Sequence, residues 1–347
     1  MSASNKILQA AAGNAAGETV FVEDVFSTYL YEGDDSYKTI NNGIDLLNEG
    51  GLVWTKSRTL SNRDNYLWDT ERGYSDGDTN FSGNTLSTNT TSAEQSGEHV
   101  RNIYEDGYQS WGGYHVNISG QDYVSWTFRK QAGFFDVQTF TAESDQFVTV
   151  NHDLGCNIGA VIYKETSGTG DWYFWHKSFS ENDIIRLNTT AAKQTAQGFI
   201  SSQTSSSARF YTDANTTSTY VAYFFGDGDD SNAQSFGDDS DESIIKCGSY
   251  TGTGSYTNPP VIDLGFEPQF VIIKNASASG DWLIGDIMRG ATSQIIGSAG
   301  EAEILKANLS NAETSYSGGY IPISPTATGF TMSIDGSEGN ASGKTYI

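Results

Sequence analysis

The stretch from Pro259 to Gly290, PPVIDLGFEPQFVIIKNASASGDWLIGDIMRG, decides how the whole chain is interpreted. It has the pattern of a buried strand, a polar turn and a second apolar segment. Two earlier stretches follow the same plan: residues 44–73, IDLLNEGGLVWTKSRTLSNRDNYLWDTERG, and residues 153–177, DLGCNIGAVIYKETSGTGDWYFWHK. Because this segment occurs three times, the sequence predicts a repeat protein, and we look for function in the array rather than in one active site.

Each copy carries the same landmarks in the same order, and the first three landmarks recur at spacings of 108 to 110 residues. The landmarks are an aromatic residue (Tyr31, Phe140, Tyr250), an Asp-Leu pair (starting at Asp45, Asp153, Asp263), a strand-ending lysine (Lys56, Lys164, Lys274) and a segment with an aliphatic residue, Asn, Ser/Thr and Ala (86–94, 185–193, 305–313). Gly-Asp-Trp also occurs twice, at 170–172 and 280–282. We expect the buried strand GGLVWTKSR of repeat 1 to end in solvated cations.

The composition predicts an all-β protein. Aromatic residues make up 13% of the 347 residues, glycine is common at 38 and proline is rare at 5. Abundant Tyr, Phe and Trp with short Ser/Thr/Asn/Gly runs is typical of strands joined by many turns. We divide the chain into an N-terminal segment (1–21), repeat 1 (22–131), repeat 2 (132–226), an acidic linker (227–242) and repeat 3 (243–347).

Repeat 3 has a shortened closing strand. The first two repeats close with QDYVSWTFRK (121–130) and TYVAYFF (219–225), whereas GKTYI (343–347) aligns only with the start of those strands. A closing strand that is cut short would leave backbone groups and apolar partners uncovered. From this alignment we expect the natural polypeptide to continue beyond Ile347.

The N-terminal segment precedes the first repeat and is rich in alanine. Its residues 5–12 include Ile7 and Leu8 and are followed by Gly13, a pattern that favours a short helix. We interpret the segment, helical or extended, as a docking segment that attaches the array to a larger assembly through Ile7 and Leu8. The alternative is a frayed terminus.

The net charge of −24 and the pI of about 4.3 are unfavourable for binding nucleic acid, which requires a basic face. There is no run of 18 apolar residues and no apolar secretory core, so we expect synthesis in the cytoplasm without membrane insertion. Seven acids lie in GDGDDSNAQSFGDDSDE (226–242), which we interpret as a solvated linker. Asp227-x-Asp229 begins like a calcium loop, but the turn glycine and the terminal glutamate are missing, so we predict no metal.

Several catalytic motifs are missing from the sequence, which has no P-loop, HExxH, CxxC pair or strand-to-helix GxGxxG. Cys156 and Cys247 are interpreted as buried hydrophobic residues, and the four scattered histidines as structural. Paired carboxylates can cleave glycosides, but one shared position of the repeats holds Asp69, His176 and Asp286, which differ in type. We therefore predict no enzymatic activity and no cofactor, with a glycan-cleaving site in one repeat as the alternative.

The seven tryptophans indicate both cores and binding surfaces. Trp54 and Trp126 lie on strand patterns, and we expect them to fill cores. Trp111 lies in YQSWGGYH between Tyr108 and Tyr114, a glycine-rich stretch that favours an exposed loop. We predict a surface contact formed by Tyr108, Trp111 and Tyr114.

A family resemblance rests on the motifs MSASNKILQAAAGNAAGE, DVFSTYLYEG, INNGIDLLNEGGLVWTKSR, LWDTERG, LSTNTTSAE and YVSWTFRK, and on the later SIIKCGSYTGTGS, IDLGFEPQFVIIK and GDW. They resemble marine phage virion structural proteins, often labelled tail fibre or tail-associated proteins of cyanophages. The resemblance covers nearly the whole chain. It implies a non-enzymatic virion component built from repeated β-sandwich units, and it carries over no catalytic residue. Repeat 2 departs from it, because FWHKSF stands where the other repeats have WDTERG and GDIMRG.

The residues and the resemblance together predict three tandem antiparallel β-sandwiches of jelly-roll or lectin-like type. We expect a tail fibre or tail-attached appendage, on the tail rather than the head, that docks to other virion proteins and contacts a host glycan or receptor. Fibres are often trimers, so we expect a homo-oligomer, although no heptad repeat sets its number. The alternatives are a capsid head appendage or decoration protein, a host-glycan depolymerase, and a cellular adhesin, which would need a secretion signal.

Overall fold

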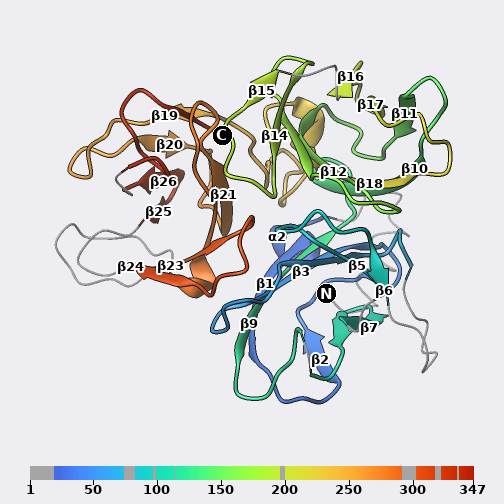
Figure 1. Cartoon of the computed structure of the whole chain (residues 1–347). Helices are drawn as coiled ribbons and strands as arrows, with labels where there is room; N and C mark the ends of the chain where they lie inside the picture. The colour runs from blue at the N-terminus through green and yellow to red at the C-terminus, as the bar shows by residue number, and fades with distance from the viewer. Residues whose placement is uncertain are drawn as a thin grey trace, which may run out of the picture.

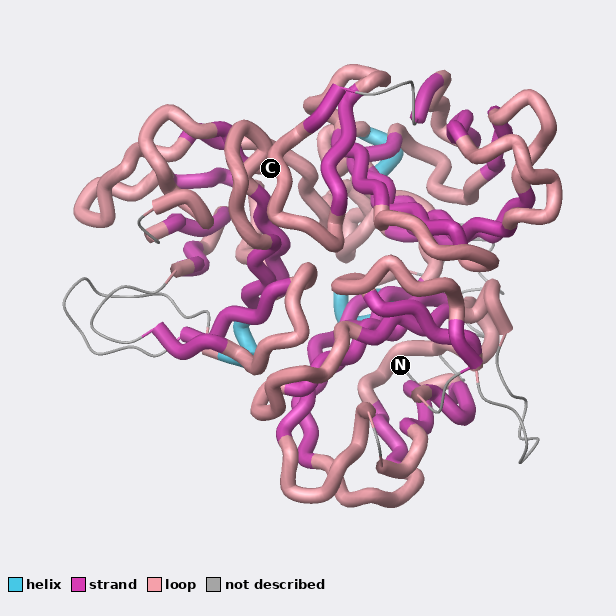
Figure 2. The backbone as a smooth tube through the Cα atoms, viewed as in Figure 1, coloured by secondary structure: helices cyan, strands magenta, loops and turns pink. Residues whose placement is uncertain are grey.

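The structure is a computed structural model that describes residues 19–73, 83–96, 99–113, 115–195, 200–290, 302–316, 322–333 and 336–347 (Figure 1). Within these residues the regular secondary structure is almost entirely antiparallel strand, joined by long loops, which confirms the predicted all-β class (Figure 2). The helical elements described are single turns: α2 (Val22–Val25), η1 (Ser231–Ala233) and η2 (Ile287–Arg289). None of the helices in the described residues is long and apolar enough to cross a membrane.

Repeat 1 contains a six-stranded sheet and a three-stranded sheet. The six-stranded sheet has the order β1 (Phe26–Glu32), β9 (Asp122–Arg129), β3 (Gly51–Ser57), β4 (Tyr66–Asp69), β5 (Asn84–Ser87), β6 (Gln95–Ser96). The smaller sheet has the order β2 (Lys38–Asn41), β8 (Gly107–Ser110), β7 (Val100–Tyr104).

Repeat 2 has the same strand order in both of its sheets. Its six-stranded sheet is β10 (Phe135–Thr141), β18 (Thr219–Gly226), β12 (Ile158–Glu165), β13 (Tyr173–His176), β14 (Asp183–Arg186), β15 (Gln194–Thr195). The smaller sheet is β11 (Phe147–Asn151), β17 (Ser207–Tyr211), β16 (Ile200–Ser201).

Repeat 3 keeps this order with a shorter central strand. Its sheets are β19 (Tyr250–Thr251) with β27 (Thr345–Tyr346), then β21 (Phe270–Lys274), β22 (Trp282–Asp286), β23 (Ala302–Lys306), β24 (Thr314–Tyr316), and separately β20 (Val261–Asp263), β26 (Gly329–Met332), β25 (Ile323–Thr326). Lys274 and Ile347 exchange both backbone hydrogen bonds at 3.0 Å, so β27 also joins β21.

The central strands β9 and β18 are buried on both faces. In β9, Val124, Trp126 and Phe128 face a core shared by all three repeats. Tyr123 points the other way and stacks on Tyr31, with ring centroids 5.2 Å apart, in the core of repeat 1 alone. The prediction that Trp54 and Trp126 fill cores is confirmed, since they are 3% and 0% exposed.

The three repeats gather around the shared core instead of forming an extended string. They appear in Figure 1 as a blue-to-teal, a green-to-yellow and an orange-to-red lobe around a common centre. The shared core takes side chains from every repeat, including Trp54, Phe135, Trp172, Trp282 and Leu305. Burial of this apolar surface therefore stabilises the assembly of the repeats as well as each repeat.

The acidic segment 227–242 was expected to be a solvated linker, and the structure corrects this. Ala233 and Phe236 are fully buried, and Phe236 belongs to the shared core. The η1 turn is capped by the side chain of Asp230, which accepts a hydrogen bond from the N–H of Asn232. The charges are carried on the outside of a segment whose few apolar residues pack inward, so the charge run alone was misleading.

Candidate functional site

Six backbone hydrogen bonds join the repeats in a ring, and we call them the ring contacts. Repeat 1 binds repeat 2, repeat 2 binds repeat 3, and repeat 3 returns to repeat 1, through equivalent residues each time. The bonds are Glu94 N to Thr166 O (2.8 Å), Gly170 N to Thr91 O (2.9 Å), Lys193 N to Ala276 O (2.9 Å), Gly280 N to Thr190 O (2.9 Å), Glu313 N to Arg58 O (2.9 Å) and Arg63 N to Ser310 O (3.2 Å). The ring is closed within one polypeptide.

The repeated Asn and Asp landmarks fold the residues that make these contacts. In repeat 2, the Asn188 side chain accepts from the N–H of Trp172 (3.0 Å) and donates to Asp171 (2.9 Å). In repeat 3, Asn308 does the same with Trp282 and Asp281, both at 2.8 Å. In repeat 1, the Asn89 side chain accepts from the N–H of Asn65 (2.8 Å) and donates to Asp64 (2.7 Å). Each asparagine thus ties the segment before one strand to the segment after the next strand.

The residue fixed by each asparagine then reaches into a neighbouring repeat. The indole N–H of Trp172 donates to Ser87 O (2.9 Å), and that of Trp282 donates to Arg186 O (3.1 Å). Asn65 takes this position in repeat 1 and donates to Leu309 O (2.8 Å). The asparagine landmarks and the Gly-Asp-Trp tryptophans therefore help to hold the repeats together.

A buried acid–arginine pair follows the second strand of repeats 1 and 3. Asp69 accepts from Arg72 Nε at 2.6 Å, and Asp286 accepts from Arg289 Nε at 2.7 Å. Side-chain exposure is 2% or less for all four residues. Each aspartate also accepts the N–H of its own arginine, which closes a tight turn. Because buried charges are stabilised only when paired, neither member can be removed alone without a large cost.

Each of these aspartates also binds the central strand of another repeat. Trp126 of repeat 1 donates its indole N–H to Asp286 at 3.0 Å. Tyr223 of repeat 2 donates its hydroxyl to Asp69 at 2.8 Å. The shared position therefore serves contacts between repeats, and its carboxylates are occupied by an arginine and an aromatic donor. That arrangement leaves neither aspartate as a free general acid or base.

His176 occupies the equivalent position in repeat 2 and is 3% exposed. Burial, with a smaller contribution from Lys177, lowers the pKa of His176 to about 4, so the imidazole is neutral near pH 7. Its Nδ1 accepts the N–H of Ser178 at 3.1 Å, which places the ring proton on Nε2. His176 lines a cavity of about 380 Å³ beside Ile347, together with Phe270, Ile272 and Cys247.

The three landmark lysines are buried, which corrects the expectation that the strand of repeat 1 ends in solvated cations. Lys56, Lys164 and Lys274 are 0% exposed and are paired within the strand ladder, with Val124, Val221 and Trp282 respectively. Their ammonium groups donate to backbone carbonyls, as Lys274 does to Gly280 O (2.8 Å) and to Thr190 O of repeat 2 (3.1 Å). Burial lowers the pKa of each to about 8.

We expect the three landmark lysines to make a contribution to the free energy of unfolding that rises as the pH increases from about 8 to 10. The unfolded lysines keep their protons to about pH 10.5, whereas the folded ones begin to lose theirs near pH 8. The unfolded state then binds more protons, so stability increases by at most about 1.4 kcal/mol per pH unit for each lysine. Urea unfolding at pH 7, 8, 9 and 9.5 measures this slope. Lys164→Met should reduce the slope of the unfolding free energy against pH, whereas the exposed control Lys344→Met should not; a slope that Lys164→Met leaves unchanged would contradict the assignment.

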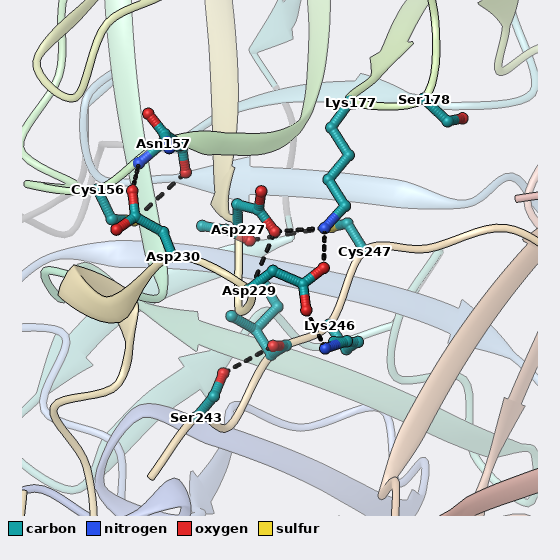
Figure 3. Close-up of polar contacts among 12 residues, drawn as sticks. Cys156, Asn157, Lys177, Ser178, Asp227, Asp229, Asp230, Ser243, Lys246 and Cys247 are labelled. Atoms are coloured by element: carbon teal, nitrogen blue, oxygen red, sulfur yellow. Dashed lines mark hydrogen bonds and ion pairs between the residues drawn. The ribbon is translucent and has the colours of Figure 1, made fainter. Parts of the chain in front are cut away.

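A charged cluster lies where the acidic segment meets repeats 2 and 3 (Figure 3). Lys177 binds Asp227 and Asp229, both at 2.5 Å, and Lys246 binds Asp229. The Lys177 ammonium thus lies between the two carboxylates that resembled the start of a calcium loop. In the described part of the chain, no three His, Cys, Asp or Glu residues are grouped to hold a metal. The cluster instead holds Lys246, the neighbour of Cys247, close to repeat 2.

The predicted surface contact is only partly placed on the surface. Tyr108 is 1% exposed and fills the core of repeat 1, because β8 pairs with β2 and β7 and turns it inward; its prediction as a surface residue is wrong. Trp111 is half-buried and meets the ring of Tyr37 edge-on, at 5.4 Å between centroids. Arg101 lies 4.0 Å above the same Tyr37 ring, which is 50% exposed. Tyr114, Ile7 and Leu8 lie outside the described residues.

Sequence reasoning also missed a histidine cluster in repeat 1. His99 and His115, expected to be isolated, stack with ring centroids 5.3 Å apart. The Tyr66 hydroxyl is 2.9 Å from His115 Nδ1, and the Thr85 hydroxyl is 3.0 Å from His99 Nδ1. Nothing in their spacing of 16 residues indicates this contact, since the two loops are joined only through the smaller sheet.

These contacts define a class of protein: a single-chain ring of three antiparallel β units closed around one shared core. The chain belongs to the family described as a domain of unknown function, DUF7483, whose model matches residues 22–347. The match spans all three repeats and starts at the first residue of α2. Comparisons with curated proteins and with solved structures found no match.

Proposed function

We propose that this protein is a structural component of a phage virion, attached to the tail and contributing to host attachment. We further propose that each pair of sheets is a β-sandwich of jelly-roll or lectin-like type. The protein then works by binding and spacing, without catalysis or a cofactor. The virion assignment rests on the resemblance of its motifs to marine phage virion structural proteins.

The observation that carries a structural role is how the repeated residues are used. The landmark asparagines fix Trp172 and Trp282, and these tryptophans hydrogen-bond to neighbouring repeats. The aspartates of the shared position are bound by arginine and by an aromatic donor from another repeat. A chain whose repeated polar residues lock three units into one block is suited to present surfaces at fixed positions.

The proposed partners are other virion proteins and a host surface glycan or receptor. Docking to the particle is assigned to segment 1–21, and the protein assembles with further copies of itself. The half-buried Trp111, packed against the exposed Tyr37 beneath Arg101, is the candidate contact for a sugar ring, since aromatic faces stack on apolar sugar faces.

A capsid decoration protein is a second candidate, and the shape of the molecule favours it. The repeats form a compact ring around one core instead of a linear shaft. A compact block with a net charge of −24 fits a knob on a particle surface, where repulsion keeps particles apart.

Immunogold electron microscopy of purified virions, with an antibody raised against residues 135–347, tests both candidates. Gold at the tail is the expected result, followed by blocking of adsorption to host cells by the same antibody. Gold spread over the capsid would favour the decoration protein. Unlabelled particles, with the protein free in the lysate, would contradict a virion role and reopen the depolymerase alternative.

A further inference from the structure

The outer face of the smaller sheet carries an equivalent aromatic pair in repeats 1 and 2. In repeat 1, Tyr37 and Trp111 lie one step beyond the ladder of β2 and β8, and their rings meet edge-on at 5.4 Å. In repeat 2, Phe147 pairs with Tyr211 at the same place in the ladder of β11 and β17, and these rings also meet edge-on, at 5.5 Å. Both pairs lie on the face away from the core, because the residues next to them along the strands are buried in it.

An arginine packs on the corresponding ring of each pair. The guanidinium carbon of Arg101 lies 4.0 Å from the centre of the Tyr37 ring, and that of Arg209 lies 4.0 Å from the centre of the Phe147 ring. The chain has 43 acidic residues, and Arg58, for example, binds a glutamate at 2.8 Å. Within the part of the chain that the structure describes, neither Arg101 nor Arg209 forms an ion pair with a carboxylate. Both guanidinium groups therefore keep N–H donors for a further acceptor.

The two arginines reach this position from different strands. Arg209 is the third residue of β17, and its equivalent, the third residue of β8, is Gln109. Arg101 belongs to β7 and lies where the pairing register shifts between Val100 and Asn102. Its Nη1 donates to Gln109 Oε1 at 3.3 Å, so Gln109 holds a guanidinium from the next strand where Arg209 supplies its own. The two repeats share the arrangement of the side chains, which we call the aromatic–arginine cluster, although they form it from different residues.

Repeat 3 forms the same smaller sheet without this cluster. If the ladder that pairs Val261 with Thr331 is continued by two residues, it leads to Pro259 and Ser333 in place of the aromatic pair. Thr331 takes the place of Arg209, as the third residue of its strand. The strand order of the sheet is nevertheless unchanged. Since the sheet folds without the cluster, the presence of the cluster in two repeats is better explained by binding than by folding.

The chemistry of the cluster favours an acidic sugar. Tyr37 is 50% exposed, and the exposed parts of the aromatic rings offer an apolar surface for the apolar face of a sugar. The arginine beside them suits a carboxylate, because guanidinium and carboxylate are both planar and can bind through two parallel hydrogen bonds. A phosphate group would bring up to two negative charges, which a single arginine in a chain of net charge −24 would not neutralise. A uronic acid combines a sugar ring with one carboxylate.

We propose that repeats 1 and 2 each bind a uronic acid residue of a glycan through the aromatic–arginine cluster. The sugar ring lies against the exposed part of the aromatic pair, and its carboxylate accepts hydrogen bonds from Arg101 or Arg209. Repeat 3 binds no such residue, so one chain holds two. This inference rests on the glycan contact of the proposed function, names the class of sugar and adds a second site, and it is independent of where the protein lies on the virion.

NMR titration with cellobiouronate, a disaccharide with one carboxylate, tests the proposal. We expect saturable shifts of the Nε–H signals of Arg101 and Arg209, with unchanged amide signals of Thr331 and Ser333 in repeat 3. Cellobiose, which has a hydroxymethyl group in place of the carboxylate, should bind at least about tenfold more weakly. Arg101→Gln should abolish the amide shifts of repeat 1 alone, and Arg209→Gln those of repeat 2 alone. The control Lys344→Gln removes an exposed charge of repeat 3 and should change neither.

Four results would overturn the inference, and they differ in what they leave standing. Equal binding of cellobiose would exclude an acidic sugar and leave the glycan contact intact. Equal binding of cellobiose that carries a sulfate ester in place of the carboxylate would exclude specificity for a uronic acid. Unchanged binding in the double variant Arg101→Gln/Arg209→Gln would show that the arginines only shield the aromatic rings. An absence of shifts with either disaccharide at millimolar concentration would exclude both sites, whereas the virion role is decided separately by the immunogold labelling.

Discussion

Replacing Asp286 with alanine should lower the free energy of unfolding by about 3–5 kcal/mol, because it leaves a buried arginine without its partner. Arg289 is 0% exposed and donates to Asp286 through both Nε and its backbone N–H. The substitution also removes the acceptor of the Trp126 indole, so this hydrogen bond between repeats 1 and 3 is lost. Urea unfolding followed by tryptophan fluorescence measures the change.

Two variants control this experiment. Asp239→Ala removes an exposed acid from the acidic segment and should change stability by no more than about 0.5 kcal/mol. The double variant Asp286→Ala/Arg289→Met should be more stable than Asp286→Ala alone, because no unpaired charge is then buried. If Asp286→Ala unfolds at the same urea concentration as the unaltered chain, the Asp286–Arg289 pair does not stabilise the ring of repeats.

Trp282→Ala should cost a similar amount, about 3–5 kcal/mol, and should open the contact between repeats 2 and 3. Trp282 is 1% exposed in the shared core, and its indole donates to Arg186 O at 3.1 Å. Trp282→Phe keeps a six-membered aromatic ring but loses the hydrogen bond and part of the buried volume, so it should cost about 1–3 kcal/mol. Amide exchange at Lys193 and Gly280, which form the ring contacts there, reports the opening.

The matched control is Trp111→Phe, at a half-buried position away from the shared core, which should leave unfolding nearly unchanged. Faster exchange at Lys193 and Gly280 together with unchanged exchange at Glu94 and Gly170 would place the damage at one junction. Equal acceleration at all junctions would instead mean that the ring opens as a single cooperative unit. Unchanged stability in Trp282→Ala would contradict the role of this tryptophan.

The all-β class could be predicted because it depends on local patterns. Alternation such as that of Val124, Trp126 and Phe128 is set by the geometry of a single strand. The landmarks were equally visible, since they recur in one order along the chain. The contacts that these landmarks form could not be predicted, because Asn188 binds Trp172 and Asp171 within its own repeat, while Trp172 binds Ser87 in another repeat. Periodicity shows which residues are equivalent, and it does not show which residues are in contact.

The errors have physical causes of the same kind. A lysine that ends an apolar run is normally solvated, but Lys164 faces Val221 on a strand that continues past it, and carbonyls replace water. Tyr108 lies near glycines that favour a loop, yet pairing with β2 turns it into the core. The charge of the acidic segment masked Phe236, a single apolar residue that decides where the segment packs. In each case a partner distant in sequence outweighed the local signal.

Because the ring is closed within one polypeptide, its three junctions do not need to have identical residues. In a homotrimer with threefold symmetry, one substitution alters three interfaces at once, so a change that suits one junction is imposed on the other two. Here Asn65 reaches across one junction where tryptophans cross the others, and His176 stands where its counterparts are aspartates. Each junction can therefore be altered by a mutation that leaves the other two intact, and one of the three can acquire a specificity of its own.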